Sequence, residues 1–336
     1  MQLPAHTEKS DSLREGSVSA FKLISAELSR VRDLVDEQLV SGSRVPGLGQ
    51  LLGTLKSCGG KMIRPGLVLL AGKAVGKVTP KHIRIAAIVE IIHNATLLHD
   101  DVIDEGKRRR GAPTINSLWG NESAVLLGDF LLSRVFKMCV DLEPGVIKVI
   151  AAAAAQTCEG ELRQVIQKEN WQLSESEYIE IITEKSAGLF RSCCYLGGLL
   201  AGAGEKQLEA LAEFGCNFGV AFQMTDDLLD IIGDEGKTGK TLGSDVNKNK
   251  LTLAVIHLLR TVDESGKIGL KEKLLAGGKS REKLVKMLKQ HGSLKYVRSR
   301  VQEFVAKAIE SLRDLEESEA KAALIETARF VEGRAA

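Results

Sequence analysis

Aromatic residues and prolines are scarce in this chain of 336 residues, with aromatics at 4% and only 6 prolines. Few prolines leave long segments without a helix breaker, and many Ala, Leu, Glu and Lys residues favour helix. No segment alternates apolar and polar residues over the length of a strand. The sequence therefore predicts an all-α fold.

Three further absences exclude broad classes of protein. The six cysteines form no CxxC pair, which indicates reduced thiols in a cytosolic protein rather than a disulfide framework. The longest apolar run, IAAIVEIIHNATLL, is interrupted by Glu90 and His93, so we expect no transmembrane helix. The formal net charge is only +2, so nucleic acid or an anionic membrane is not bound through bulk charge.

The domain organisation follows from the two ends of the chain. The first seventeen residues are polar and lack the apolar segment of a signal peptide. We expect residues 1–17 to form a flexible N-terminal tail and residues 18–336 to form one helical domain. The expected protein is soluble and cytoplasmic.

Two aspartate clusters are the strongest features that the sequence contains. In LLHDDVIDEGKRRRGAP, residues 97–113, one helical turn carries Asp100, Asp101 and Asp104, and four basic residues follow. In FQMTDDLLDIIGDEGKTGK, residues 222–240, Asp226, Asp227 and Asp230 repeat the arrangement. Like charges on one turn repel each other, and the end of a helix already disfavours negative charge. Both clusters adjoin apolar sequence, so they are predicted to be two helix ends that face each other across one cavity.

Clusters of this composition indicate a metal and a phosphate ligand. Carboxylate ligands select a hard cation such as Mg²⁺, which keeps part of its hydration and shares phosphate oxygens. The arginines that follow the first cluster can bind a diphosphate through planar bidentate contacts. A single acidic turn is more often a solvated helix face, so the hypothesis depends on the presence of both clusters.

The order of several motifs resembles the trans (head-to-tail) isoprenyl diphosphate synthase family over nearly all of residues 20–260, and most closely its long-chain polyprenyl members. The two aspartate-rich stretches match that family's first and second motifs. GGKMIRPGL is similar to its GGKRxRP element, EKSAGLF to its K[ST]A element, and GKTLGSDVNKNKLT to its lysine loop. The resemblance implies an isoprenoid synthase-type fold, a single large helical bundle with a deep central cavity, and a homodimer.

The resemblance also implies a role for each matching residue. Asp100, Asp104 and Asp226 would bind three Mg²⁺ ions, with Asp230 as a further metal residue and Asp101 and Asp227 in support. The allylic diphosphate would be held by Arg109, Lys185, Ser186, Gln223, Lys240 and Lys250. Isopentenyl diphosphate would be held by Lys61, Arg64, His93 and Arg110. The catalytic set is expected to comprise the aspartates Asp100, Asp101, Asp104, Asp226 and Asp227 together with Lys185 and Lys240.

Several of these residues have ordinary structural interpretations as well. Lys61 and Arg64 could belong to a surface turn, and His93 could be a core histidine. His93 precedes Asp100 by two helical turns, however, so one helix face carries both. Lys185 is followed by Ser186, Ala187 and Gly188, small residues that suit a kinked helix and a close approach.

Product length is predicted from the residues that precede Asp100. Ile92, Ala95 and Thr96 lie one to two turns below the aspartates, where the growing chain would descend. In the family an aromatic residue near the Ala95 position stops elongation early, so Ala95 favours a long all-trans product. A short-chain synthase that makes geranylgeranyl or farnesyl diphosphate, and a non-catalytic partner subunit of a heteromeric synthase, are the alternatives.

Overall fold

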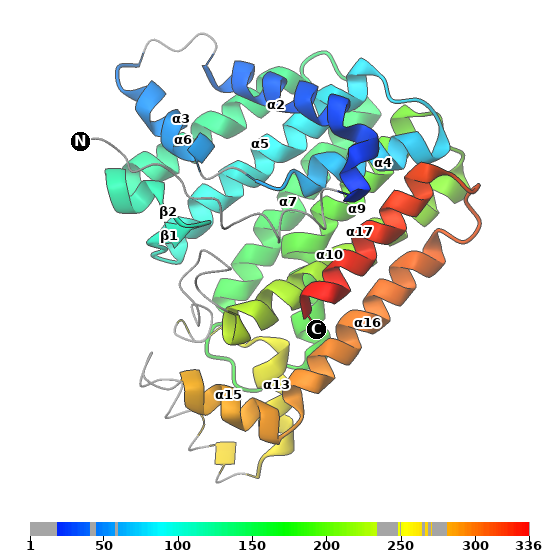
Figure 1. Cartoon of the computed structure of the whole chain (residues 1–336). Helices are drawn as coiled ribbons and strands as arrows, with labels where there is room; N and C mark the ends of the chain where they lie inside the picture. The colour runs from blue at the N-terminus through cyan, green and yellow to red at the C-terminus, as the bar shows by residue number, and fades with distance from the viewer. Residues whose placement is uncertain are drawn as a thin grey trace.

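The computed structural model describes residues 19–40, 45–57, 60–233, 248, 250–263, 266–267, 270 and 281–335. The predicted tail, residues 1–17, and the predicted site residue Lys240 lie outside these ranges. Figure 1 shows that the described chain is built almost entirely from helices, which confirms the all-α prediction. In chain order these are η1 (Lys22–Ile24), α2 (Ser25–Val40), α3 (Leu48–Ser57), α4 (Ile63–Val75), α5 (Pro80–Ile103), α6 (Ile115–Cys139), α7 (Pro144–Ile166), α8 (Glu175–Ile182), η2 (Thr183–Ala187), α9 (Gly188–Leu200), α10 (Glu205–Ile232), α13 (Leu253–Thr261), α15 (Arg281–Gln290), α16 (Ser293–Ser311) and α17 (Glu319–Ala335).

A small hairpin departs from the sequence prediction, which contains no strand. Strand β1 (Arg108–Arg109) pairs antiparallel with β2 (Ala112–Pro113). Arg110 and Gly111 form the turn with φ values of 53° and 82°, as a two-residue hairpin of this kind requires. The hairpin follows the first aspartate cluster directly and turns the basic segment back toward it.

Helix α5 lies in the middle of the bundle and carries the first aspartate cluster at its C-terminal end (Figure 1). Pro80 occupies the first turn of the helix and Thr79 its N-cap position, where Pro and Thr are favoured. Most of its side chains between Ile83 and Leu98 are buried, because helices pack around it on several sides. Asp100, Asp101 and Asp104 therefore stand where a buried helix emerges from the core.

Helix α10 carries the second aspartate cluster in its last two turns. It packs against α9, α16 and α17, and Figure 1 shows α17 lying across it, so that the C-terminal end of α17 is near α10. Gly233 follows as the C-cap residue. Both clusters thus occupy helix C-termini, as the sequence predicts.

The segment between α8 and α9 is a five-residue π-helix, η2 (Thr183–Ala187), and the close approach predicted for its small residues is present. Two glycines allow neighbouring helices to approach it closely. A Cβ added to Gly160 of α7 would lie 2.3 Å from the backbone nitrogen of Lys185, and one added to Gly219 of α10 would lie 2.6 Å from Cα of Ala187. Helix η2 is therefore clamped between α7 and α10, and π-helical turns of this kind are frequent at functional sites.

None of the helices in the described ranges is long and apolar enough to cross a bilayer.

Candidate active site

The first aspartate cluster is balanced by cations in the structure. Arg109 donates hydrogen bonds from Nε and Nη2 to the Asp101 carboxylate at 3.0 and 2.8 Å. Lys250 Nζ lies 2.7 Å from Asp104 Oδ1, and Lys248 Nζ lies 3.6 Å from the same atom. Burial acts to raise the pKa of Asp104, but Lys250 and its neighbours lower it overall. The predicted diphosphate ligands Arg109 and Lys250 thus lie at the aspartates of the first cluster.

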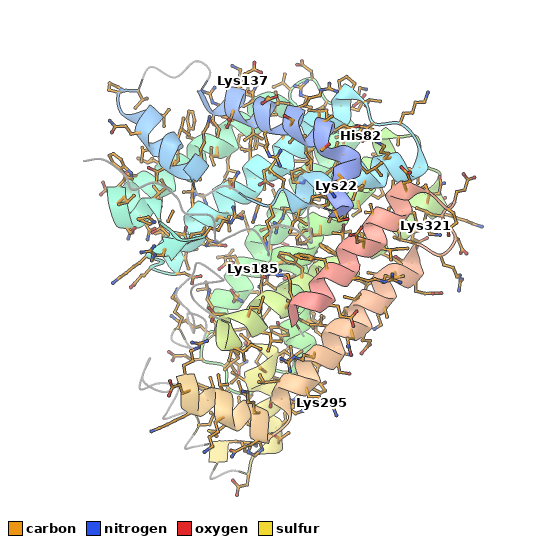
Figure 2. All side chains as sticks on the ribbon, viewed as in Figure 1. Lys22, His82, Lys137, Lys185, Lys295 and Lys321 are labelled. Carbon is orange, nitrogen blue, oxygen red and sulfur yellow. The ribbon has the colours of Figure 1, made fainter. Side chains whose placement is uncertain are left out.

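Asp100 has a different environment, because its charge is not fully compensated. Burial raises its pKa to about 6, although Lys185 acts in the opposite direction. Lys185 forms an ion pair with Glu161 of α7 and donates a hydrogen bond to Gln164 at 2.8 Å. Figure 2 labels Lys185 in the interior of the bundle. The carboxylate of Glu161 further disfavours ionisation of Asp100, whereas Arg109 favours it.

The aspartates of the second cluster have different hydrogen-bond partners. Asp226 Oδ1 accepts a hydrogen bond from Arg334 Nη2 of α17 at 2.8 Å. Asp227 accepts hydrogen bonds from Tyr178 Oη and Gln223 Nε2, both at 2.7 Å. Asp230 is half-buried at the end of α10. Asp226 is therefore the member of this cluster that forms an ion pair with an arginine of α17.

Helix η2 connects the two clusters. Lys185 is near enough to Asp100 and Asp104 for both to raise its pKa against the effect of burial. The next residue, Ser186, donates a hydrogen bond to Gln223 Oε1 on α10 at 2.7 Å. The structure thus brings Lys185, Ser186 and Gln223 together, as the assignment to one allylic diphosphate site requires.

Three of the four residues predicted for isopentenyl diphosphate form one cationic cluster, because Arg110 lies near enough to both Lys61 and Arg64 to add to the effect of burial in lowering their pKa. The pKa of Lys61 is lowered by burial, then by the nearby charges of Arg334 and Arg110. The guanidinium of Arg64 lies 4.3 Å from the ring centre of Phe190, and its Nε is buried without a hydrogen-bond partner. Arginine side chains grouped in this way can bind a diphosphate through planar bidentate contacts.

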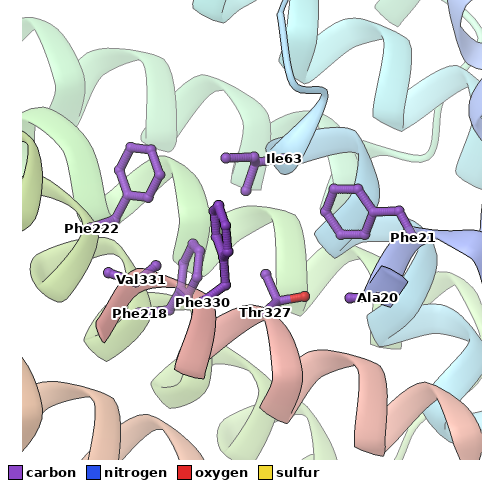
Figure 3. A pocket seen from close by; sticks show the side chains of 8 residues that line it. All are labelled: Ala20, Phe21, Ile63, Phe218, Phe222, Thr327, Phe330 and Val331. Carbon is purple, nitrogen blue, oxygen red and sulfur yellow. The ribbon is translucent and has the colours of Figure 1, made fainter. Parts of the chain in front are cut away.

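Phenylalanine rings pack against these cations. Phe190 and Phe222 both pack with Phe218, at ring-centre distances of 5.2 and 5.9 Å. Figure 3 shows Phe21, Phe218, Phe222 and Phe330 around a cavity of about 10 Å³, which is room for about one water molecule. Lys61 Nζ lies 5.5 Å from the Phe330 ring and Arg334 Cζ lies 5.3 Å from the Phe222 ring. The cations therefore stand at the edge of a nearly dry aromatic cluster, where charge is poorly screened.

The remaining predicted residues lie along α5. His93 is half-buried, and its carbonyl oxygen accepts a hydrogen bond from Thr96 Oγ1 at 2.9 Å. Ile92 and Ala95 are buried, with Ala95 completely inaccessible. Their assignment to product length stays a prediction.

Four residues near the site are absent from the sequence prediction. Glu90 is buried on α5 beside the predicted cations: a Cβ on Gly60 would lie 3.0 Å from both Glu90 Oε1 and Arg110 Nη1. Burial raises the pKa of Glu90, and Arg64 and Arg110 oppose that effect. The other three are Tyr178, Glu161 and Arg334. The sequence signals only Glu90, as a lone acid in an apolar run.

The residues present fit a hard divalent cation bound together with a diphosphate. In the described part of the chain, no three His, Cys, Asp or Glu side chains already surround a common metal position. Yet the Glu161 Oε1 atom is buried without a hydrogen-bond partner, and the pKa of Asp100 is raised to about 6. Both observations mark a place where added positive charge would be stabilising, and all the candidate donors are carboxylate oxygens, which Mg²⁺ prefers.

A helical bundle with two carboxylate clusters and basic residues beside them is the arrangement of an enzyme class that joins isoprenoid diphosphates. The polyprenyl synthetase family model matches residues 45–291. Octaprenyl diphosphate synthase of Haemophilus influenzae is 36% identical over 310 residues, 91% of this chain and 94% of that protein. The short chain isoprenyl diphosphate synthase of Methanothermobacter thermautotrophicus is 33% identical over 96% of this chain and 98% of that protein.

Solved structures give the same result. The polyprenyl synthase of Caulobacter crescentus CB15 superposes with a TM-score of 0.90 and 30% identity, covering 98% of this chain and 100% of that one. The chain belongs to the polyprenyl synthetase family, and it is a prenyltransferase. The family's substrates are isopentenyl diphosphate and allylic diphosphates.

Proposed function

We propose that the chain is a Mg²⁺-dependent head-to-tail prenyltransferase that extends an allylic diphosphate with isopentenyl diphosphate to a long-chain all-trans polyprenyl diphosphate. The observation that carries the proposal is the pair of carboxylate clusters at the ends of α5 and α10, connected through Lys185 and Ser186 of η2. The C. crescentus relative was solved in complex with calcium and isoprenyl diphosphate, which supports a divalent cation at this site.

The protein's residues would divide the chemistry between two diphosphate sites. Bound Mg²⁺, three ions by family analogy, would supply Lewis-acid stabilisation of the pyrophosphate leaving group. Arg109, Lys185 and Lys250 hold the allylic diphosphate and stabilise its charge as the C–O bond breaks. Lys61, Arg64, His93 and Arg110 orient isopentenyl diphosphate so that its alkene attacks the allylic cation. A proton then leaves the new C–C product for a pyrophosphate oxygen, and buried apolar side chains exclude water meanwhile.

Ala95 supports a long-chain product rather than a short one. Its methyl side chain is small and buried, and the relative in Haemophilus influenzae is named an octaprenyl diphosphate synthase. The relative in Methanothermobacter thermautotrophicus is named a short chain synthase, which supports the short-chain alternative. Both motifs and their cations are retained, which argues against a non-catalytic partner subunit.

A homodimer and a cytoplasmic location complete the proposal. Apart from Val45 and Ile103, the exposed large apolar side chains of the described residues lie on α6, at Val140 just after it, and on α7. We name these the α6–α7 apolar surface: Leu118, Trp119, Val125, Leu126, Phe136, Val140, Leu162, Val165 and Ile166. Exposed apolar side chains on two consecutive helices support an interaction site there, and in this proposal a second copy of the chain covers them. Cys139, Cys158, Cys193, Cys194 and Cys216 are free thiols, which suits a reducing compartment.

The first test is an incubation of purified protein with Mg²⁺, labelled isopentenyl diphosphate and farnesyl diphosphate, with the products sized by mass spectrometry. We expect a ladder that ends in a long polyprenyl chain. A twenty-carbon end product would establish the short-chain alternative. No product with any allylic starter would point to the partner-subunit alternative.

A further inference from the structure

Three hydrogen bonds run in series from α8 to α10 beside the allylic site. Ser186 Oγ donates to Gln223 Oε1, Gln223 Nε2 donates to Asp227 Oδ1, and Tyr178 Oη donates to Asp227 Oδ2. All three donor–acceptor distances are 2.7 Å. Two separate elements, α8 and η2, therefore hold Gln223 and Asp227, which lie one turn apart on α10.

The chemistry of the groups fixes the direction of the series. An ionised carboxylate only accepts hydrogen bonds, so the tyrosine hydroxyl and the amide NH₂ must both donate to Asp227. If the amide of Gln223 were reversed, its carbonyl oxygen would face the carboxylate and be repelled. Asp227 thus determines which face of the Gln223 amide meets Ser186 and the site.

Tyr178 lies at one end of this series and donates its hydrogen bond to Asp227. Its side chain is 3% exposed, so it lies inside the protein rather than on the substrate-facing surface. Asp227 would lose the donor on its Oδ2 atom without the hydroxyl, and its carboxylate could then rotate away from Gln223. Because Gly160 and Gly219 clamp η2, the Ser186 end of the series is already fixed by backbone contacts. The Asp227 end of the series is held through hydrogen bonds from the side chains of Tyr178 and Gln223.

We propose that Tyr178 is a positioning residue of the prenyl transfer reaction, which acts through Asp227 to orient Gln223 toward the allylic diphosphate. Asp227 then serves as an anchor for Gln223, while Asp226 and Asp230 remain the metal candidates of that cluster. The inference rests on the proposed function, since it assumes that Gln223 contacts the allylic substrate.

The test compares Tyr178→Phe with Tyr296→Phe in the full-length enzyme. Tyr296 offers a matched control because its hydroxyl also donates to a carboxylate of this region, Glu175 at the start of α8, at 2.6 Å. We expect the KM for farnesyl diphosphate to rise about tenfold in Tyr178→Phe, with the KM for isopentenyl diphosphate unchanged, because a hydrogen bond to a charged group is lost. Tyr296→Phe should leave both KM values at the wild-type level.

A double-mutant cycle with Gln223→Ala separates positioning from a general loss of stability. If Tyr178 acts through Gln223, adding Tyr178→Phe to Gln223→Ala causes no further rise in the KM for farnesyl diphosphate. Equal kinetics for Tyr178→Phe and Tyr296→Phe, or fully additive effects in the cycle, would overturn the inference while the proposed function stands. A wild-type enzyme without turnover would overturn both.

Discussion

His82 shows how a titratable residue serves the fold of this protein rather than its chemistry. The backbone N–H of Thr79 donates to Nδ1 at 3.0 Å, and Nε2 donates to the Gly197 carbonyl oxygen at 3.0 Å. Only the neutral ring can satisfy both contacts, because Nδ1 must be free to accept. Burial lowers the pKa of His82 below its usual value of 6.5, so the folded protein resists protonation there.

We expect the free energy of unfolding to fall as the pH drops below about 6.5, because the unfolded chain binds a proton at His82 that the folded chain excludes. The stabilisation is complete above this pH and is lost progressively below it. In His82→Asn this part of the pH dependence should be absent, although the variant is less stable at every pH. Urea unfolding of both proteins between pH 5.5 and 8 measures the difference. An unchanged slope would mean that His82 does not contribute to it.

Other residues near the site could not be identified from the sequence, for physical reasons. Glu90 stands out as a charge in an apolar run, but only the fold shows that Arg64 and Arg110 lie beside it. Tyr178 and Arg334 are common residue types on amphipathic helices, and they approach α10 from segments 49 and 108 positions away. The aspartates were predictable because repulsion on one helical turn is visible locally. Contacts between distant segments leave no local signal.

Helix η2 is the element on which the site most depends, since it contributes both Lys185 and Ser186. The small residues after Lys185 predict the kink, but not that it takes the form of a five-residue π-helix. That form depends on the glycines of α7 and α10 that face it. Helix α5, in contrast, begins where Thr79 and Pro80 predict, because its start signals are local.

Gly160→Ala tests this clamp. The added Cβ would stand 2.3 Å from the Lys185 nitrogen, so α7 and η2 must separate, at a cost of about 1–3 kcal/mol in unfolding free energy. We expect prenyl transfer to fall about tenfold or more as Lys185 shifts, because small misplacements of a catalytic group are costly. Thermal unfolding and steady-state kinetics measure the two effects.

Gly145→Ala is the matched control on the same helix. A Cβ at Gly145 meets no atom within 4 Å, and alanine favours helix over glycine. Its activity should equal that of the wild type, with stability equal or slightly higher. Matching behaviour of the two variants would show that η2 is not clamped by α7.

At the scale of the whole molecule, the length of the product is predicted to depend on Ala95. Ala95→Phe would place an aromatic ring below Asp100 and should shorten the longest polyprenyl chain. Overpacking also lowers stability by about 1–3 kcal/mol, but a smaller amount of folded enzyme slows every elongation step without changing the end product. Mass spectrometry of the product ladder therefore tests the placement directly. An unchanged distribution would show that the chain does not pass Ala95.

Assembly is the second property of the whole molecule. Leu162 and Ile166 are 62% and 77% exposed on α7. Replacing both by Asp should convert the expected dimer to a monomer in light scattering, because charge is unfavourable at a buried interface. Val45 is 65% exposed but lies outside the α6–α7 apolar surface, so Val45→Asp should remain dimeric. A monomeric wild-type protein would contradict the assignment.

The scarcity of aromatic residues has a practical result for observing that assembly. The chain has two tryptophans: Trp171 packs against the core, whereas Trp119 is 41% exposed on the α6–α7 apolar surface. When a second copy covers that surface, the indole of Trp119 passes from water to an apolar environment. The intrinsic emission of the unlabelled protein should shift to shorter wavelength as the copies associate, so a dilution series in a fluorimeter would give their dissociation constant.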